Sequence, residues 1–322
     1  MTKRMWASTQ TTLDISGNKG YFDVSYGTES EAQKLDIWLP DHNHSPFPVL
    51  FMIHGGGFTA LDKRSSEANE FILEGIHRGY AVVSTNYRMN DVAIFPFPVM
   101  DVKQAIRYIQ ANATKYNLDP SRLIIFGGSA GGYLTLMAVL NRNNPYFDNK
   151  EDSNIEFSPN IKGAIALYPV TDFAKLDYQL KVNSLINKSN KKVEDISESY
   201  VEAFPLSEED SFPFHNTEDS VCSIFLGSPL PESAVSLRHA NPISHINSNV
   251  PPILIQHGSG DEIIPMQQSI NFTLQTNEIC KEERVICDIL PGAIHGSVKF
   301  HSEENMNRIF KWVEQVMSTQ IS

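Results

Sequence analysis

A serine between glycines, directly after an apolar run, is the feature that most restricts how this chain can fold. Ser129 stands in Gly127-Gly128-Ser129-Ala130-Gly131 and follows Leu123-Ile124-Ile125-Phe126. This order is typical of a buried strand that turns sharply into a helix and presents the serine hydroxyl above a sheet. Glycine is needed where a side chain would collide with the turn or with the following helix. The pattern predicts a serine nucleophile, which needs a base, an acid and an oxyanion hole from other parts of the chain.

Apolar runs that suit strands alternate with helical patterns along most of the chain. Continuous runs of this kind fit strands that are buried on both faces of a parallel sheet. The expected strands span residues 21–26, 34–39, 49–53, 81–85, 123–126, 163–167, 253–255 and 284–290. Helical spacing of apolar residues predicts helices that begin near Pro98, after Ser129 at 133–140, and over 306–317 near the end. We therefore expect an α/β protein with a mostly parallel, twisted sheet flanked by helices, folded as a single domain over 1–322.

Residues 171–247 interrupt this alternation. Between Val193 and Ser220 there are nine acidic residues and no lysine or arginine, with Phe204, Phe212 and Phe214 among them. The segment is too long for a simple loop. It predicts a cap inserted over the active site, and the alternative is a solvated surface excursion that plays no part in substrate choice.

Composition argues against several kinds of partner and compartment. The formal net charge is -12, and no lysine/arginine cluster is present, so nucleic acid and anionic membranes are not expected partners. Three cysteines without metal-ligand spacing predict free thiols in a reducing compartment. Two basic residues near the N-terminus are not followed by an apolar run, so an ordinary signal peptide is not expected. No run approaches the roughly 20 apolar residues that cross a bilayer, and we expect a cytoplasmic protein without membrane insertion.

Histidine and aspartate candidates for the base and the acid follow Ser129 in the chain. His295 stands in the glycine-flanked loop Pro291-Gly292-Ala293-Ile294-His295-Gly296, after the last expected strand. Asp261 follows the strand at 253–255, at the edge of the sheet where sites of α/β proteins gather. The order serine, acid, histidine is the one that this kind of serine turn requires. We predict that His295 is the base and Asp261 the acid that orients it.

Rival assignments exist for both residues. Glu262 is adjacent to Asp261 and is the alternative acid, and Asp261 could instead be only the N-cap of a helix ahead of Pro265. His301 also follows the acid, but we expect it to open the final helix. His257 lies too early in the chain to be the base, and we expect it to shape the turn before Asp261.

A glycine run supplies the expected oxyanion hole. His54-Gly55-Gly56-Gly57-Phe58 follows the strand at 49–53, and glycines let backbone N–H groups approach a substrate oxygen. The residue after the nucleophile contributes a further amide in such sites. We predict that the amides of Gly56, Gly57 and Ala130 form the hole and that His54 holds the loop.

With these motifs in place, the chain resembles the α/β-hydrolase carboxylesterases of the hormone-sensitive-lipase-like group. That group carries His-Gly-Gly-Gly before an aromatic residue and Gly-x-Ser-Ala-Gly-Gly, which match 54–58 and 127–132, and the match extends over roughly 33–315. Further stretches are similar to acetyl-xylan and feruloyl esterases and to kynurenine formamidases; they are Asn86-Tyr87-Arg88, Asp101-Val102, Phe225-Leu226-Gly227 and Ala240-Asn241-Pro242-Ile243. The acid stands in His-Gly-Ser-Gly-Asp, closer to the acetyl-xylan and feruloyl type than to the Asp-Pro-Leu of lipase-like members. The resemblance implies an α/β-hydrolase fold.

The expected activity is hydrolysis of short-chain acyl esters through a Ser-His-Asp triad and an acyl-enzyme, with no metal or organic cofactor. The resemblance, rather than any residue pattern, favours short acyl chains and allows a homodimer. Phe58, Phe95 and Phe97 could line a substrate pocket or could belong to the core. Two alternatives stay open: an amide hydrolase of the formamidase or small exopeptidase type, and a non-catalytic ligand-binding protein on the same scaffold.

Overall fold

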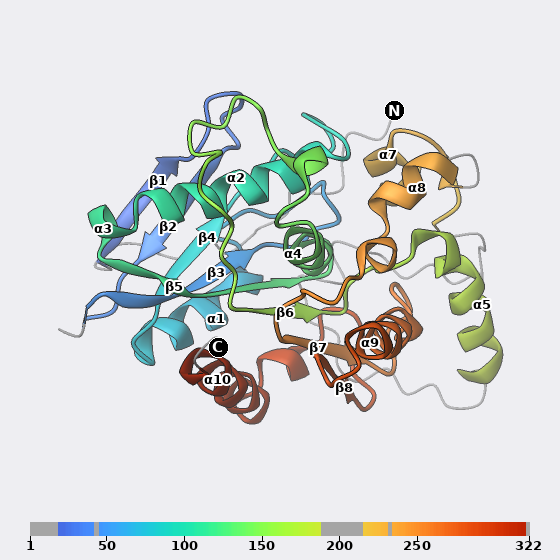
Figure 1. Cartoon of the computed structure of the whole chain (residues 1–322). Coiled ribbons are helices and arrows are strands. Elements are labelled where there is room, and N and C mark those ends of the chain that lie inside the picture. The colour runs from blue at the N-terminus through green and yellow to red at the C-terminus, as the bar shows by residue number, and fades with distance from the viewer. Residues whose placement is uncertain (1–18, 42–44, 188–214, 231–233, 320–322) are drawn as a thin grey trace.

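The computed structural model describes residues 19–41, 45–187, 215–230 and 234–319, and these form a central sheet flanked by helices (Figure 1). The sheet has eight strands in the order β1-β2-β4-β3-β5-β6-β7-β8. β2 runs antiparallel to β1 and β4, and every other neighbouring pair is parallel. The strands are β1 (Gly20–Ser25), β2 (Lys34–Trp38), β3 (Phe47–Ile53), β4 (Ala81–Thr85), β5 (Leu118–Gly128), β6 (Gly163–Leu167), β7 (Ile253–Gly258) and β8 (Val285–Leu290).

Each strand expected from the sequence is present, and the predicted fold class is confirmed. β4 and β6 have the predicted bounds, whereas β5 begins at Leu118 instead of Leu123. The additional residues of β5 pair with Phe47 and Pro48 at the start of β3, across a register shift. Polar residues and Pro120 interrupt the apolar pattern there, so the sequence does not reveal this part of the strand.

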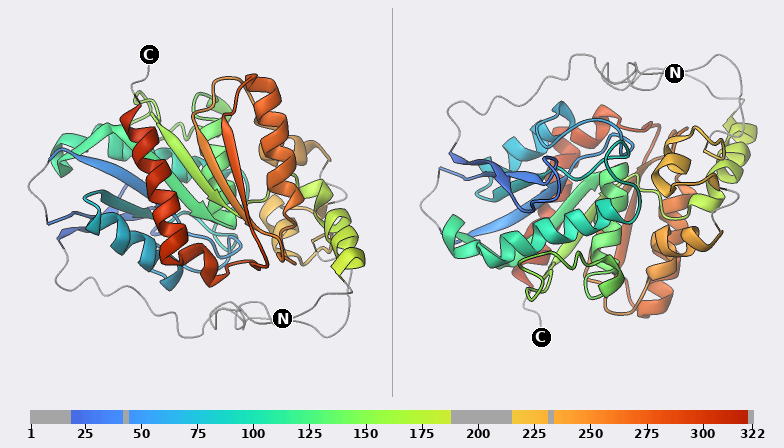
Figure 2. Two further views of the ribbon diagram at one scale, coloured as in Figure 1. Left: turned by 90° about the horizontal axis from the view of Figure 1, so that it is seen from below. Right: turned by 90° about the horizontal axis from the view of Figure 1, so that it is seen from above.

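Helices cover both faces of the sheet, as Figure 2 shows from two opposite sides. α1 and α10 pack on one face, where Phe71 stacks on Phe126 of β5 with ring centroids 3.8 Å apart. α2, α4 and α9 pack on the other face. Burying an aliphatic or phenylalanine side chain contributes about 1.5–3 kcal/mol, so these two apolar layers stabilise the sheet that carries the site. The helices outside the segment 171–247 are α1 (Ser66–His77), α2 (Phe97–Ala111), α3 (Ala113–Tyr116), α4 (Ala130–Leu140), η1 (Pro145–Phe147), α9 (Gln267–Cys280), η5 (Val298–His301) and α10 (Glu303–Ser318).

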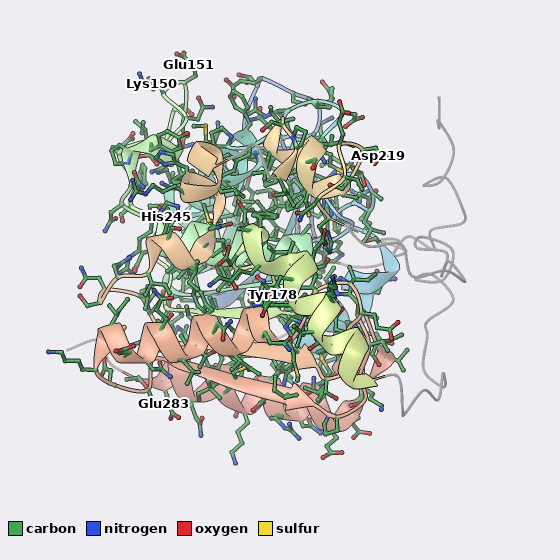
Figure 3. The ribbon with its side chains drawn as sticks, turned by 90° about the vertical axis from the view of Figure 1, so that its right-hand side faces the viewer. Lys150, Glu151, Tyr178, Asp219, His245 and Glu283 are labelled. Atoms are coloured by element: carbon green, nitrogen blue, oxygen red, sulfur yellow. The ribbon has the colours of Figure 1, made fainter. Side chains whose placement is uncertain are left out.

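The segment 171–247, hereafter the inserted segment, connects β6 to β7, and its described helices lie at one end of the molecule (Figures 1 and 3). In Figure 3, α5 runs between α9 below and α7 and α8 above, with Tyr178 on its outer side. Phe204, Phe212, Phe214 and most of the acidic run at 193–220 lie outside the described residues. The elements described in the segment are η2 (Phe173–Lys175), α5 (Leu176–Asn187), α7 (Val221–Leu226), α8 (Ala234–Ala240) and η4 (Pro242–His245).

Among the residues that the structure describes, no helix is both long and apolar enough to cross a bilayer. α10 has 16 residues and two glutamates in its first turn, whereas a crossing takes about 20 mostly apolar residues. The same residues contain no group of three or more histidine, cysteine, aspartate or glutamate side chains placed to hold a metal ion. The cytoplasmic location and the lack of a cofactor stay predictions.

Candidate active site

Ser129 occupies the sharp turn between β5 and α4 at the carboxyl edge of the sheet. Its φ and ψ are 54° and -120°, a conformation that residues with a side chain rarely adopt. The backbone holds this turn on both sides, because Ser129 N–H donates to Leu167 O of β6 and Ser129 O accepts from Tyr133 N–H of α4. A Cβ on Gly131 would lie 2.1 Å from Ile53 O, so only glycine permits this contact between the turn and β3. The predicted strand-turn-helix geometry is therefore present.

The structure brings Ser129, His295 and Asp261 into one hydrogen-bonded chain. Ser129 Oγ lies 2.9 Å from His295 Nε2, and His295 Nδ1 lies 2.7 Å from Asp261 Oδ2. His295 and Asp261 are each 4% exposed, whereas Ser129 is half-buried. An arrangement of nucleophile, base and orienting acid at these distances can abstract the serine proton during attack on a carbonyl.

Asp261 is held by both of its carboxylate oxygens. Oδ1 accepts backbone N–H bonds from Ile263 and Ile264, each 2.9 Å long, and Oδ2 faces His295 and, at 3.3 Å, His257 Nε2. Burial by itself would raise the pKa of Asp261, but the two histidines outweigh it and lower that pKa well below its usual range. The ionised carboxylate can only accept, so His295 carries its proton on Nδ1 and leaves Nε2 free to accept from Ser129 Oγ.

The structure places the alternative acid and the alternative histidine away from the hydrogen-bonded chain. Glu262 is exposed, and the acid within hydrogen-bond distance of His295 is Asp261. Asp261 is not the N-cap of α9, because that helix begins at Gln267 and Met266 precedes it. His301 ends η5 rather than opening α10, and its imidazole faces Glu70 of α1 at 3.7 Å.

His257 has the turn-shaping position that the sequence predicts. It is fully buried, with Nδ1 2.6 Å from Ser269 Oγ of α9 and Nε2 2.7 Å from Ile264 O. The ring therefore joins β7 to α9 and to the turn that carries Asp261.

The glycine loop after β3 has an unusual backbone. Gly56, Gly57 and Phe58 have φ values of 89°, 58° and 62°, so three successive residues lie in the left-handed region. A Cβ on Gly56 would lie 2.0 Å from Ala60 O. Within the described part of the chain, no hydrogen bond uses the amides of Gly56, Gly57 or Ala130, which leaves these donors available to a ligand.

His54 and Tyr87 hold the glycine loop in place. Their rings stack with centroids 4.5 Å apart, and Tyr87 Oη lies 3.1 Å from both His54 O and Gly55 O. Burial lowers the pKa of His54 to about 4, so the ring is neutral at neutral pH. The next residue, Arg88, forms a buried ion pair with Asp101 of α2 at 2.6 Å. These contacts give a physical reason for Tyr87 and Arg88 in the Asn-Tyr-Arg stretch and for Asp101 in the Asp-Val stretch.

An aromatic cluster lies beside the glycine loop at 54–58. Phe58 stacks on Phe225 of α7 with centroids 3.9 Å apart, and Tyr133 packs edge-on against both rings. Phe95 joins the cluster at its edge, whereas Phe97 is 43% exposed and lies under the Arg88 guanidinium. The cluster brings together residues from two helices and two loops that are far apart in the sequence, so no local pattern indicates that Phe225 belongs to it.

Tyr168 is a further residue of the site that sequence reasoning missed. It follows β6, has a φ of 38° and is almost fully buried. Its ring centroid lies 4.6 Å from that of His295 and 4.7 Å from that of Phe300. A single tyrosine after an apolar run carries no motif, so only the structure places it against the imidazole.

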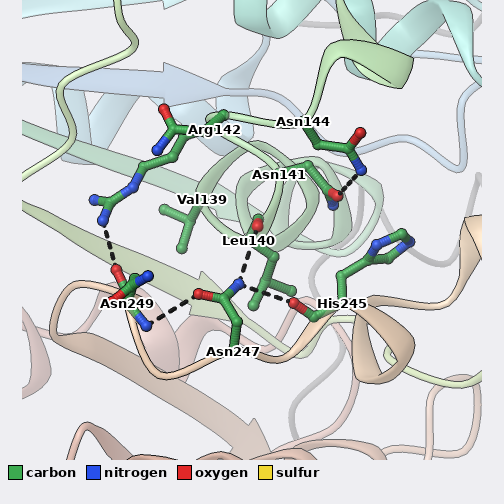
Figure 4. A pocket seen from close by; sticks show the side chains of 9 residues that line it. Val139, Leu140, Asn141, Arg142, Asn144, His245, Asn247 and Asn249 are labelled. Carbon is green, nitrogen blue, oxygen red and sulfur yellow. Dashed lines mark hydrogen bonds between the residues drawn. The ribbon is translucent and has the colours of Figure 1, made fainter.

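A polar pocket of about 320 Å³ lies away from this site, at the carboxyl end of α4 (Figure 4). Five asparagines and Arg142 are among the residues that line it. Asn247 donates to Leu140 O, and Arg142 donates to Asn249 O. Ser129 is at the opposite end of α4, so this pocket is not part of the catalytic arrangement.

The sequence profile of the BD-FAE family matches residues 35–275. This chain belongs to the BD-FAE family. The matched range contains the glycine loop, Ser129 and Asp261, and His295 follows it. The resemblance to α/β-hydrolase esterases is thereby confirmed at the level of the family.

Curated and solved relatives agree with this placement of the BD-FAE chain. The "Probable carboxylic ester hydrolase LipM" of Mycobacterium tuberculosis is 29% identical over 269 residues, which are 83% of this chain and 54% of that protein. The chain thus spans about half the length of the curated relatives that it matches. A solved "Truncated form of carbohydrate esterase from gut microbiota" superposes with a TM-score of 0.78 at 21% identity, covering 96% of this chain and 99% of that one. Butyrate-bound Est2 of Thermogutta terrifontis superposes with a TM-score of 0.66 at 17% identity, covering 94% and 95%. These two structures support the fold.

Proposed function

We propose that this protein is a serine carboxylesterase that hydrolyses short-chain acyl esters through an acyl-enzyme. The observation that carries the proposal is the hydrogen-bonded chain Ser129–His295–Asp261, together with the amides of Gly56, Gly57 and Ala130, which make no hydrogen bond within the described residues. Acyl transfer by a serine nucleophile uses a base, an orienting acid and oxyanion donors together, and no single sequence motif would bring all of these groups to one place. The relative whose name is "Probable carboxylic ester hydrolase LipM" is consistent with this chemistry.

In the proposed mechanism, His295 Nε2 takes the proton of Ser129 Oγ as the oxygen attacks the ester carbonyl. The negative charge that develops on the carbonyl oxygen is stabilised by N–H groups of Gly56, Gly57 and Ala130. Each such donor typically contributes about 2.7–4 kcal/mol to the transition state. His295 then protonates the leaving alcohol and activates a water molecule for deacylation, while Asp261 stabilises the charged imidazole.

The inserted segment is proposed to act as a cap on the single hydrolase domain. α7 supports this role, because Val221 Cγ1 lies 3.2 Å from the position of a Cβ on Gly57 and Phe225 stacks on Phe58. The same helix is joined to the loop before α2 by the bond from Phe95 N–H to Phe225 O. A cap in this position would limit the space beside the oxyanion loop.

Short acyl groups are proposed because the aromatic cluster fills the space next to the glycine loop. Phe58, Tyr133 and Phe225 are each 4% exposed or less and pack on one another. We expect Phe225→Leu to raise the ratio of kcat/KM for octanoate to that for butyrate by at least about tenfold, since removing a ring makes room for additional methylenes. The measurement is the rate of p-nitrophenyl ester hydrolysis. Phe272→Leu, an equally buried change on α9, is the control that should leave this ratio unchanged.

The experiment that tests the function itself is a comparison of initial rates on p-nitrophenyl esters from acetate to laurate, with aminoacyl anilides and N-formylkynurenine alongside. A maximal rate on acetate, propionate or butyrate supports the proposal. A faster rate on the amides would assign the chain to an amide hydrolase instead. Lack of both turnover and fluorophosphonate labelling would favour a ligand-binding protein.

A further inference from the structure

The turn that carries Asp261 is held by two buried histidines from different parts of the chain. The amides of Ile263 and Ile264 donate to Asp261 Oδ1. The carbonyls of the same two residues accept from histidine rings: Ile263 O lies 2.8 Å from His215 Nε2, and Ile264 O lies 2.7 Å from His257 Nε2. Each histidine therefore fixes one end of the short backbone segment that aims the carboxylate.

The ring contacts of His215 define its protonation. A carbonyl oxygen only accepts, so His215 donates from Nε2. Its Nδ1 lies 3.4 Å from Cys222 Sγ of α7, and burial raises the pKa of that thiol to about 12, so the thiol is protonated and can donate. Burial also lowers the pKa of His215, which keeps the ring neutral. The titratable groups near this ring are Asp177, whose carboxylate accepts the His215 backbone N–H at 2.8 Å, together with Asp261 and His295.

His257 and His215 belong to different parts of the fold. His257 belongs to β7, so its bond is part of the central sheet. His215 belongs to the inserted segment. It contacts Asp177 of α5 and Cys222 of α7, and so lies between these two helices. The inserted segment thus makes a direct, buried hydrogen bond to the backbone that positions the acid.

We propose that His215 is a positioning residue for the catalytic carboxylate: through its Nε2–H bond to Ile263 O, the inserted segment holds Asp261 in line with His295. This inference rests on the esterase function proposed above. The inserted segment then does more than cover the site, because part of the catalytic geometry depends on it. A displacement of about 1 Å in a catalytic group can cost on the order of 100-fold in rate, so loss of this bond has a measurable effect.

The test replaces His215 by side chains that either keep or lose a hydrogen-bond donor at the position of Nε2. The amide of glutamine reaches the Nε2 position, whereas the amide of asparagine stops near Nδ1. We expect His215→Asn and His215→Leu to lower kcat by about 10- to 100-fold per active site, with KM changed less than about twofold, and His215→Gln to recover most of the rate. Active sites are counted by burst titration, so a variant that is only partly folded does not count as a slow enzyme.

His245→Leu is the matched control. It is also a histidine of the inserted segment whose Nε2 donates to a backbone carbonyl, that of His239 at 2.7 Å, but it lines the remote pocket of Figure 4. We expect it to leave kcat per active site unchanged. If it lowers kcat as much as His215→Leu, general loosening of the segment explains both results and the proposal is overturned.

A spectroscopic measurement separates positioning from packing. The proton between His295 Nδ1 and Asp261 should give a far-downfield proton resonance in the native enzyme, in His215→Gln and in His245→Leu. We expect that resonance to be lost or shifted upfield in His215→Asn. Equal kcat in His215→Asn and His215→Gln, with the resonance intact in both, would refute the role of His215 while leaving the esterase function standing. Failure of the native enzyme to hydrolyse esters would instead refute the function itself.

Discussion

Ser129→Ala is expected to lower kcat on a short-chain p-nitrophenyl ester by at least about 10⁴-fold while the protein stays folded. The only atom removed is the Oγ that lies 2.9 Å from His295 Nε2. The turn itself is held by backbone bonds to Leu167 and Tyr133, which the substitution leaves in place. Thermal unfolding followed by circular dichroism should therefore give a melting temperature close to that of the native protein.

Ser121→Ala is the control for this experiment. Ser121 is on the same strand, β5, but its hydroxyl bonds to Asp119 and not to the catalytic chain. This variant should keep the native rate and the native reactivity toward a fluorophosphonate. Retention of more than a few per cent of the activity in Ser129→Ala would show that another group is the nucleophile.

Asp261→Asn is the second change with a large expected effect, and the structure explains why an isosteric substitution is damaging. Oδ1 accepts two backbone N–H bonds, so this position must remain an oxygen. The new NH₂ group is then forced to face His295 Nδ1, where it can donate but not accept. The imidazole must move its proton to Nε2, where it no longer accepts from Ser129, and we expect kcat to fall by on the order of 10⁴-fold.

The effect of Glu262→Gln on kcat distinguishes Asp261 from Glu262 as the acid that orients His295. Glu262→Gln removes a charge next to Asp261 from an exposed side chain, and we expect kcat to stay within about threefold of the native value, as for most exposed positions. Both variants are compared by kcat on butyrate and by the rate of fluorophosphonate labelling. A larger loss of kcat in Glu262→Gln than in Asp261→Asn would mean that Glu262, and not Asp261, is the acid that orients His295.

Asp261 also has a defined pH dependence. Its folded-state pKa lies below the usual value, so its contribution to stability is fully present above the pKa that it has in the unfolded chain. That contribution is lost as the pH falls toward the folded pKa, and the carboxylate stays ionised over the pH range in which an esterase is assayed.

Several parts of the site could be predicted from the sequence because their chemistry depends on neighbouring residues. The serine turn requires glycine at 127 and 131, and the loop after β3 requires successive residues at positive φ, so both are visible as short motifs. The strands of the central sheet are visible as apolar runs because both of their faces are buried. The order of serine, acid and histidine along the chain then selects Asp261 and His295 as candidates.

Other parts depend on contacts between residues that are distant in the sequence. Phe225 meets Phe58 across 167 positions of the chain, Tyr168 packs on His295, and His215 reaches Ile263 O. Aromatic and histidine side chains of this kind have no distinguishing local pattern, because packing and hydrogen bonding through space select them. The choice between Asp261 and Glu262 is different: the sequence favours Asp261, and in the structure Asp261 is the acid within hydrogen-bond distance of His295.

The sequence by itself determined the strands, the serine turn, the glycine loop and the candidate triad, since each follows from local backbone sterics or from apolar patterning. Only the tertiary structure decided that Ser129, His295 and Asp261 form one chain of hydrogen bonds, and that an aromatic cluster adjoins the glycine loop at 54–58. It also decided that the inserted segment touches the acid turn through His215. The physical reason is that a hydrogen bond or a ring contact is set by distance and direction in space, which the folded chain alone fixes.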